Sequence, residues 1–372
     1  MLKVTFYGHD RGANDVLDSV VRIASEEADM DIVRIPSFGM PVSDGLKEQL
    51  YQSDAAVFGI SSDTAAGSEA RLALEALQRK PALSGKIFFV EDFPGSSGIQ
   101  DPDHRKIGPH AHLCSIEMLP RDAPEWTVYR GVHAVGIPDH WNSAMTNILV
   151  AEGVRQRDGL VKRLRGTITC VSVSPDEIVI YLPGFKDPVM EERMLRVLLS
   201  INEIGGRPVL VHFRPHPGEC HCPELAQAIV VRDAFLTGQW ELANPKITDP
   251  SDFQNARLIG ASDISIAHPG AIATFHVAAL RRQMVCPMEF VTDGNRRGTS
   301  YDYSRAVRYA HVVEHLDDVP DALTALLDRN SSESMALRQR QEAHILAFDP
   351  EATSAYGKRV MEEVSNVVNE FG

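Results

Sequence analysis

The chain has 372 residues and a formal net charge of −14, with 44% hydrophobic and 24% charged residues. At about 150 residues per domain, this length predicts two domains. The composition excludes disorder or a coiled coil as the overall state, and the acidic balance argues against broad nucleic-acid binding. No apolar run approaches the roughly 18 residues that span a bilayer. With no leader segment at its start and five scattered cysteines, the sequence predicts a cytoplasmic protein without a transmembrane segment.

Strand-like and helix-like segments alternate through the first 90 residues. The expected strands are 3–7, 31–35, 54–60 and 86–91, and the expected helices are 14–27, 44–52 and 65–79. This alternation predicts a parallel sheet that is covered by helices on both faces. Residues 92–113 have no apolar period, which predicts a long loop of the kind that is often functional.

A second alternation of strands and helices begins near Gly166. Its expected strands are 177–182, 207–213, 263–267 and 283–287, and its expected helices are 188–204, 224–236 and 271–281, with further helices from 317 to 371. The two halves therefore predict an α/β protein with two Rossmann-like parallel-sheet domains facing a central cleft. We place the boundary between residues 138 and 168.

Five loops at the ends of the expected strands contain glycine. They are Gly8–Gly12, Asp92–Gly98, Pro183–Lys186, Arg214–Gly218 and His268–Ala271. Glycine permits a close backbone approach, and the helix that follows offers free N–H groups and a partial positive charge. Four of the loops also hold Arg, Lys or His, so the set indicates phosphate binding. The alternative is that these glycines only turn the chain.

The segment RPHPGE gives the sharpest indication of a ligand. Arg214 and His216 follow an apolar strand and are flanked by two prolines. Arginine presents a planar fork to phosphate, and histidine can donate a hydrogen bond. The alternative for this segment is a rigid turn with solvated polar groups.

The order of a strand, RPHPGE, ASDISIAHPGAIATFHVAAL and an apolar strand resembles the C-terminal half of GT-B-fold proteins. The most similar groups are the UDP-N-acetylglucosamine 2-epimerases and the CDP-glycerol glycerophosphotransferase-like enzymes. The resemblance covers about residues 170–330, and over the first 150 residues it depends on the order of elements. It implies an acceptor-side domain over 1–150, a nucleotide-donor domain over 166–350, and a C-terminal helix over 351–372 that returns to the first domain.

The resemblance also implies roles for particular residues. The donor diphosphate would be flanked by Arg214, His216, His268, Gly270, Ala271 and Thr274. Gly184 and Lys186 would lie near the phosphates, and the loop with Gly8, Arg11 and Gly12 would face the acceptor or the sugar. Many relatives hold the nucleotide ribose with a Glu in the helix after the turn, whereas here no acidic residue occurs between Ile264 and Met288. This departure keeps a non-catalytic binding or scaffold protein as an alternative.

Three side chains at the ends of the first-half strands are candidate catalytic groups. Transfer to a hydroxyl needs a base near the acceptor and stabilisation of the leaving diphosphate. His9, Asp10 and Asp92 lie where a base would face the ligand, although each also suits a turn or a helix cap. Together with these candidates, the resemblance implies a metal-independent glycosyltransferase, without a cofactor, that uses a nucleotide-diphosphate sugar or related donor and an unknown acceptor. An epimerase or hydrolase is the alternative, and it would need several acid/base groups converging on one sugar.

Histidines and cysteines also raise a metal hypothesis. They gather in the long loop and after the RPHPG turn, as His104, His110, His112, Cys114, His212, His216, Cys220, His221 and Cys222. The paired spacing that is typical of structural zinc sites is incomplete. We therefore expect no metal site. A homodimer is compatible with the sequence.

Overall fold

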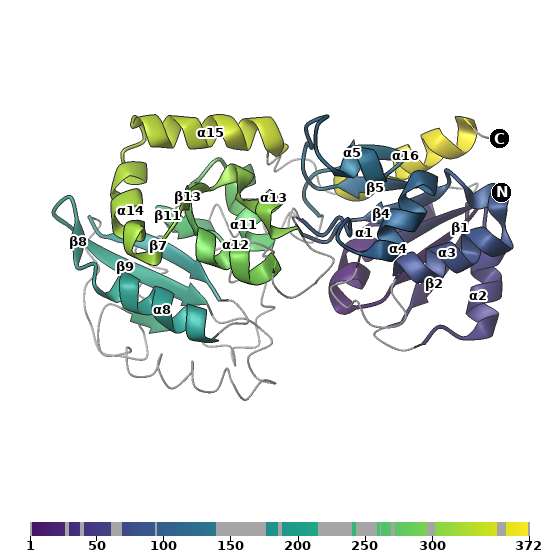
Figure 1. Ribbon diagram of the computed structural model, residues 1–372, viewed down its shortest axis with the longest axis horizontal. Helices are drawn as coiled ribbons and strands as arrows, with labels where there is room; N and C mark the ends of the chain where they lie inside the picture. Colours follow the sequence, from purple (N-terminus) through teal and green to yellow (C-terminus); the bar gives the residue numbers. More distant parts are fainter. Residues whose placement is uncertain are drawn as a thin grey trace. The chain divides into compact units, whose positions relative to one another are not determined.

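Figure 1 shows the computed structural model, which describes residues 2–26, 30–37, 41–60, 69–93, 95–138, 176–184, 188–214, 240–242, 259–260, 262–268, 272–295, 302–347 and 355–370. The chain divides into two compact units. Unit 1 consists of Met1–Ser143, Asp293–Ala306 and Ala343–Gly372, and unit 2 consists of Ala144–Thr292 and Val307–Glu342. Each unit is therefore assembled from separate stretches of the chain.

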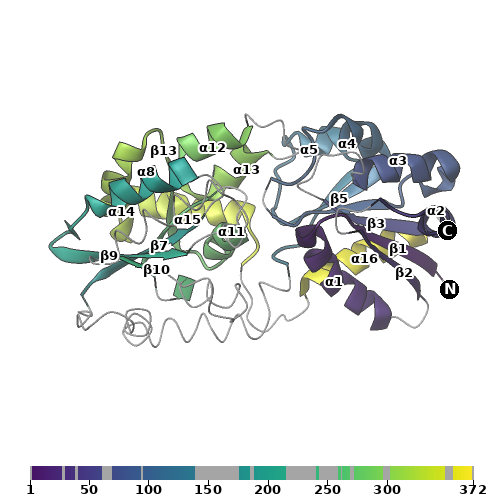
Figure 2. The ribbon, with the colours of Figure 1, turned by 90° about the horizontal axis from the view of Figure 1, so that it is seen from below.

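Unit 1 is built on a six-stranded parallel sheet with the order β2-β1-β3-β4-β5-β6. The strands are β1 (Leu2–Gly8), β2 (Met30–Pro36), β3 (Ala55–Gly59), β4 (Ile87–Val90), β5 (Ala111–Ser115) and β6 (Gly131–Ala134). The helices are α1 (Arg11–Glu26), α2 (Asp44–Tyr51), α3 (Glu69–Arg79), α4 (Pro102–Ile107), α5 (Glu125–Val128), α13 (Tyr303–Ala306) and α16 (Ala355–Glu370), with 3-10 turns at Pro81–Leu83 and Gly108–His110. Figure 2 shows α3 and α4 on one face of this sheet and α1 and α16 on the other.

Unit 2 has its own sheet, with the parallel order β10-β9-β7-β11-β12-β13 and a short antiparallel strand, β8, beside β9. The strands are β7 (Ile178–Pro183), β8 (Glu203–Ile204), β9 (Arg207–Arg214), β10 (Trp240–Leu242), β11 (Ile264–Ile266), β12 (Gln283–Pro287) and β13 (His311–Val313). The helices are α8 (Pro188–Leu199), α11 (Ile272–Ala279), α12 (Met288–Asn295), α14 (Val319–Leu327) and α15 (Ser332–His344), with 3-10 turns at Val307–Tyr309 and Leu316–Asp318. α12 begins in unit 2 and ends in unit 1.

The expected α/β class with two Rossmann-like parallel sheets is confirmed. The central strands are buried along their whole length, as in Ala55–Gly59 and Ile87–Val90, because helices cover both faces of a parallel sheet. The cores of the two sheets are separate hydrophobic clusters, one within each unit. The helix expected at 224–236 lies outside the described residues.

The prediction of a loop over residues 92–113 was wrong in its second half, which contains α4 and the start of β5. Asp101 caps α4 by accepting hydrogen bonds from the N–H groups of Asp103 and His104, and Pro102 occupies the first helical turn. These elements are only six and five residues long. Segments this short leave too little sequence for a hydrophobic period to be recognised.

The packing of β3 against α1 requires a glycine at position 59. A Cβ atom at Gly59 would lie 2.7 Å from the carbonyl oxygen of Ala13 and 2.9 Å from its Cβ. Both contacts involve atoms that cannot rotate away. The close approach of helix to sheet therefore depends on the missing side chain.

We expect Gly59→Ala to lower the free energy of unfolding by about 1–3 kcal/mol, the usual cost of overpacking a tight interior. Gly45, in α2, is the matched control, because a Cβ there meets nothing within 4 Å. Gly45→Ala should leave stability unchanged or raise it by about 0.4–1 kcal/mol. Urea unfolding followed by circular dichroism measures both, and equal stability of the two variants would contradict the packing argument.

Candidate functional site

The described site residues of unit 1 lie where β1 and β4 end. Both strands are parallel members of one sheet, so their carboxyl ends share an edge, which is where ligands bind in such sheets. β1 ends at Gly8 and is followed directly by His9, Asp10 and α1. β4 ends at Val90 and is followed by Glu91 and Asp92.

Asp10 caps the N-terminus of α1. Its Oδ1 accepts a hydrogen bond from the N–H of Ala13 at 2.8 Å, and its carbonyl accepts from the side-chain amide of Asn14 at 2.6 Å. This cap explains why α1 begins at Arg11, three residues earlier than the sequence pattern predicts. The carboxylate of Asp10 is thus used by the helix itself.

His9 is a buried residue with 5% of its surface exposed. Its Nδ1 lies 3.1 Å from the hydroxyl of Ser37 and 3.2 Å from that of Tyr7. These contacts join the end of β1 to the residue after β2. They fix the imidazole ring at the edge of the sheet.

The carboxyl group of Asp92 lies in a buried environment at the end of β4. Its Oδ1 is buried and has no hydrogen-bond partner in the described part of the chain. Its Oδ2 lies 2.6 Å from the point that a Cβ of Gly12 would occupy, so the carboxyl group lies against the first turn of α1. Burial, followed by the nearby charge of Asp10, raises the pKa of Asp92 well above its usual value, and a hydrogen bond with Ser96 opposes this only in part.

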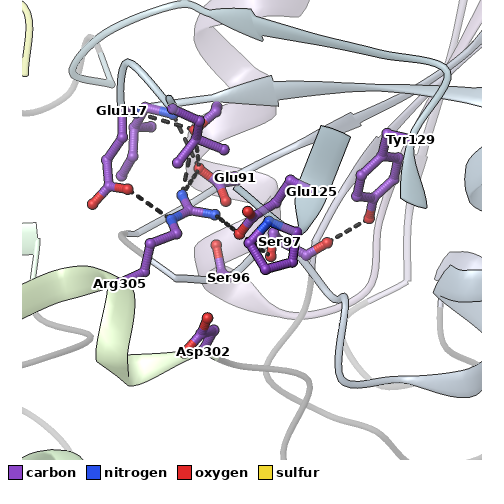
Figure 3. Close-up of polar contacts among 12 residues, drawn as sticks. Glu91, Ser96, Ser97, Glu117, Glu125, Tyr129, Asp302 and Arg305 are labelled. Atoms are coloured by element: carbon purple, nitrogen blue, oxygen red, sulfur yellow. Dashed lines mark hydrogen bonds and ion pairs between the residues drawn. The ribbon is translucent and has the colours of Figure 1, made fainter. Parts of the chain in front are cut away.

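A cluster of buried ionic groups lies beside this edge (Figure 3). The guanidinium of Arg305 donates from Nη2 to Glu91 at 2.6 Å, from Nε to Glu117 at 2.7 Å and from Nη1 to Glu125 at 3.0 Å. All four side chains are at most 1% exposed. We call these four residues the glutamate–arginine cluster.

The glutamate–arginine cluster carries more negative than positive charge. Despite its burial, the pKa of Arg305 is raised well above its usual value, because three carboxylates surround it. The hydroxyl of Ser115 also donates to Glu91 at 2.9 Å. One oxygen of Glu91 and one of Glu125 are buried without a hydrogen-bond partner among the residues that the structure describes. A buried carboxylate that keeps an unsatisfied oxygen is costly, so these groups are held in place by the rest of the unit.

In unit 2, three of the glycine-containing loops start from neighbouring strands. β9, β7 and β11 are adjacent and parallel, so Arg214, Gly184 and His268 follow strand ends at one edge of the sheet. The backbone of Arg214 pairs with Pro183 across β9 and β7. The side chain of Arg214 lies outside the described part of the structure, as do the residues Lys186, His216, Gly270 and Ala271 and the side chain of Arg11.

Thr274 closes the turn between β11 and α11. Its hydroxyl accepts a hydrogen bond from the N–H of His268 and donates to the carbonyl of the same residue, both at 3.0 Å. The ring of His268 lies 6.1 Å from that of Phe290. The hydroxyl of Thr274 is therefore used to fix the turn.

The histidines of the expected long loop have different partners. His104 contacts Tyr129 and Glu69, His110 contacts Ser84, and His112 contacts His133. Burial lowers the pKa of His112 to about 4, and it raises the pKa of the Cys114 thiol. No group of three or more potential metal-binding side chains occurs among the described residues.

The sequence did not point to Glu91, Glu117, Glu125 or Arg305 as site residues. A signal was present for Glu91, since an acidic residue directly after a buried apolar strand needs a partner. Its partner Arg305 lies 214 residues away in the sequence. No local pattern connects the two.

No protein-family model and no curated protein matches the chain. Solved structures match almost its whole length. The S. aureus MnaA–UDP co-structure has a TM-score of 0.58 and 12% identity, with 99% of this chain and 97% of that chain covered. A protein assigned as a UDP-N-acetylglucosamine 2-epimerase from Listeria monocytogenes has a TM-score of 0.54 and 11% identity, with 99% and 97% covered. A glycosyltransferase from Rickettsia africae has a TM-score of 0.51 and 10% identity, with 98% of each chain covered.

These similarities show that the chain has the GT-B fold that its sequence resemblance implies. The fold is shared by glycosyltransferases and by UDP-sugar epimerases, so it does not select one reaction. Among the described helices, none is both long and apolar enough to cross a membrane.

The raised pKa of Asp92 predicts how stability depends on pH. The native state binds more protons than the unfolded state between the ordinary aspartate pKa of about 3.9 and the raised one, so the free energy of unfolding falls as the pH rises through that interval. Asp92→Asn should therefore be more stable than the wild type at neutral pH. This advantage should shrink as the pH falls to about 4.

Asp54 is the control, because its pKa is lowered, chiefly by the hydrogen bond that its Oδ2 accepts from the N–H of Lys3 at 3.0 Å. Its contribution to stability is present above the ordinary aspartate pKa and is lost as the pH falls through the lowered value. Asp54→Asn should thus be less stable than the wild type at neutral pH, with a deficit that disappears in acid. Urea unfolding from pH 4 to 8 measures both, and an Asp92→Asn effect that is the same at every pH would contradict the assignment.

Proposed function

We propose that the protein transfers a glycosyl or related group from a nucleotide-diphosphate donor to a hydroxyl acceptor. The observation that carries this proposal is the carboxyl group of Asp92, which lies against the first turn of α1 and has a buried oxygen with no hydrogen-bond partner among the described residues. Its raised pKa makes it a stronger base than an ordinary aspartate, which suits proton removal from a hydroxyl near neutral pH. Asp10 already caps a helix, and His9 has its Nδ1 in contact with Tyr7 and Ser37, so Asp92 is the preferred base.

The donor side of the proposal uses unit 2. Arg214, Gly184 and His268 follow adjacent parallel strands, and backbone N–H groups and cations at such an edge suit a diphosphate. Lys186, His216, Gly270 and Ala271 belong to the same loops and are proposed as further donor-binding residues. Thr274 would contribute indirectly, by holding the turn at His268. The UDP in the S. aureus structure supports a nucleoside diphosphate as the shared part of the donor.

The proposed reaction needs two groups of the protein. The acceptor hydroxyl loses its proton to the carboxylate of Asp92 and forms the new bond to the anomeric carbon. The bond from that carbon to the diphosphate breaks, and its electron pair leaves with the diphosphate. Arg214 and the N–H groups of the donor loops would stabilise the developing negative charge, without any need for a metal ion.

Nucleoside diphosphates should stabilise the wild type against thermal unfolding, by about 2.7 kcal/mol at 100 times the Kd. Arg214→Ala should abolish this effect, because it removes a phosphate-binding fork. Arg207→Ala is the control from the opposite end of β9, where Nε of Arg207 donates to the carbonyl of Asp176 at 2.7 Å. Equal stabilisation of the two variants would remove Arg214 from the donor site. No stabilisation of the wild type by a panel of UDP, GDP, CDP, ADP and TDP would favour a non-catalytic protein.

Epimerisation of a sugar nucleotide is the second candidate function, and the glutamate–arginine cluster is the observation in its favour. This reaction needs several acid/base groups at one place, and Glu91, Glu117 and Glu125 converge within 3.0 Å of one guanidinium. In the structure, all three carboxylates accept hydrogen bonds from Arg305. A sugar would have to displace it, so transfer with Asp92 as the base remains the preferred proposal.

Turnover of nucleotide sugars in D₂O separates the two reactions. Transfer, or hydrolysis with water as the acceptor, breaks the anomeric C–O bond and releases the nucleoside diphosphate without deuterium entering the ring. Epimerisation breaks a ring C–H bond and incorporates deuterium. We expect diphosphate release without deuterium, and a rate about 10²–10⁴-fold lower in Asp92→Asn. Asp101→Asn, which removes only the charge of the α4 cap, is the control; deuterated product, or an unchanged rate in Asp92→Asn, would overturn the proposal.

A further inference from the structure

The segment Asp302–Arg305 contacts both sides of Asp92 in the sequence. On one side, Arg305 donates to the carboxylate of Glu91, the residue that precedes Asp92. On the other side, the N–H of Asp302 donates to the carbonyl of Gly95 at 2.7 Å. Figure 3 labels both residues, which lie at opposite ends of this short segment. We call Asp302–Arg305 the clamp segment and residues 91–97 the Asp92 loop.

Two further contacts hold the far end of the Asp92 loop, and one of them is with the same cluster. The hydroxyl of Ser97 donates to Glu125 at 3.3 Å, and Glu125 is itself held by Arg305. The hydroxyl of Tyr129 donates to the carbonyl of Ser97. The guanidinium of Arg305 is therefore connected to the Asp92 loop before Asp92, through Glu91, and after it, through Glu125.

The clamp segment is also held together by its own hydrogen bonds. Asp302 caps it, because its Oδ1 accepts from the N–H of Ser304 at 3.1 Å and from the hydroxyl of the same residue at 2.5 Å. Asp302 and Arg305 therefore act on the Asp92 loop as one body. The segment belongs to unit 1, and the chain enters unit 2 directly after it, at Val307.

Arginine suits this position better than any other cation. Its planar fork donates from Nε, Nη1 and Nη2 to three different carboxylates, whereas lysine has a single nitrogen. Burying so much charge is costly, and a hydrophobic group of similar size often gives equal or greater stability. The arrangement is therefore better explained by the geometry that it imposes than by the stability that it adds.

We propose that Arg305 is a positioning residue for Asp92, which it holds against the N-terminal turn of α1 by fixing both ends of the Asp92 loop. This inference rests on the proposed function, in which Asp92 is the base. It goes beyond that function by assigning a role to a residue more than 200 positions away that touches neither donor nor acceptor in the proposed reaction.

The experiment measures amide exchange in the Asp92 loop and the pKa of Asp92, and it does not need enzymatic turnover. In Arg305→Gln, amide hydrogen exchange within residues 95–98 should accelerate by about tenfold or more, while β1 and β3 keep wild-type protection. The pKa of Asp92, measured by carbon-13 NMR of its carboxyl group, should fall towards the ordinary value, because water reaches the loosened loop. Arg329→Gln, the loss of an exposed arginine in unit 2, should change neither quantity.

The direction of the pKa change separates positioning from a purely electrostatic effect. If Arg305 only neutralised Glu91, its loss would leave a negative charge beside Asp92, and the pKa of Asp92 would rise. A raised or unchanged pKa in folded Arg305→Gln would therefore overturn the proposal. If that variant does not fold, Arg305→Met combined with Glu117→Gln and Glu125→Gln removes most of the unpaired charge and still breaks the contact with Glu91. The same two measurements then apply.

The result also distinguishes failure of this inference from failure of the proposed function. A wild type without turnover, but with a loop and a pKa that respond to Arg305→Gln, would overturn the reaction and support the positioning. Normal turnover, with a loop exchange rate and an Asp92 pKa that Arg305→Gln does not change, would support the reaction and overturn the positioning.

Discussion

The three stretches of chain that form unit 1 meet at Glu91. The side chain of Glu91 binds Arg305 from the middle stretch, and its carbonyl accepts a hydrogen bond from the hydroxyl of Tyr356, in α16, at 2.9 Å. The first stretch adds the hydroxyl of Ser115 and the N–H of Ile116, which both donate to the same carboxylate oxygen. The position of Asp92, the next residue, is therefore defined by contacts from the whole unit.

Glu91 and Asp92 lie next to each other at the end of β4, and the surroundings of their carboxyl groups differ. Each has one buried oxygen without a partner among the described residues, but Glu91 Oε2 accepts from Ser115, Ile116 and Arg305, whereas Asp92 has the like charge of Asp10 nearby. Burial and the nearby charge of Asp10 raise the pKa of Asp92 well above its usual value. A buried carboxyl group whose pKa is raised in this way is typical of sites that move protons.

The fold could be predicted because its sequence signal is repeated many times. Buried strands such as Ala55–Gly59 and Ile87–Val90 are apolar, and helical patterns recur between the strands, so a single error does not change the class. The elements that were missed, α4 and the start of β5, are short, and they depend on a cap at Asp101 and on burial of His104 and Ile107. Tertiary packing determines the secondary structure of such short segments, and the local sequence does not reveal that packing.

The candidate site could be predicted only where its residues follow strands directly. His9, Asp10 and Asp92 could be proposed as candidates because the carboxyl ends of parallel strands share an edge, whatever side chains they carry. The sequence does not show which of them has a carboxyl oxygen without a described partner. That depends on the first turn of α1 and on Gly12, and only the structure shows it.

The contacts of Arg305 could not be predicted from the sequence, and the reason is stronger. Its partners Glu91, Glu117 and Glu125 are separated from it by 180 or more residues, and a lone arginine in a polar stretch has the same local pattern as a solvated one. A fold that is preserved at 12% identity or less restricts the buried apolar positions but leaves such polar contacts free to differ. Structural similarity therefore shows the fold of this chain, and the chain's own ionic contacts determine the surroundings of each carboxyl group at the strand ends.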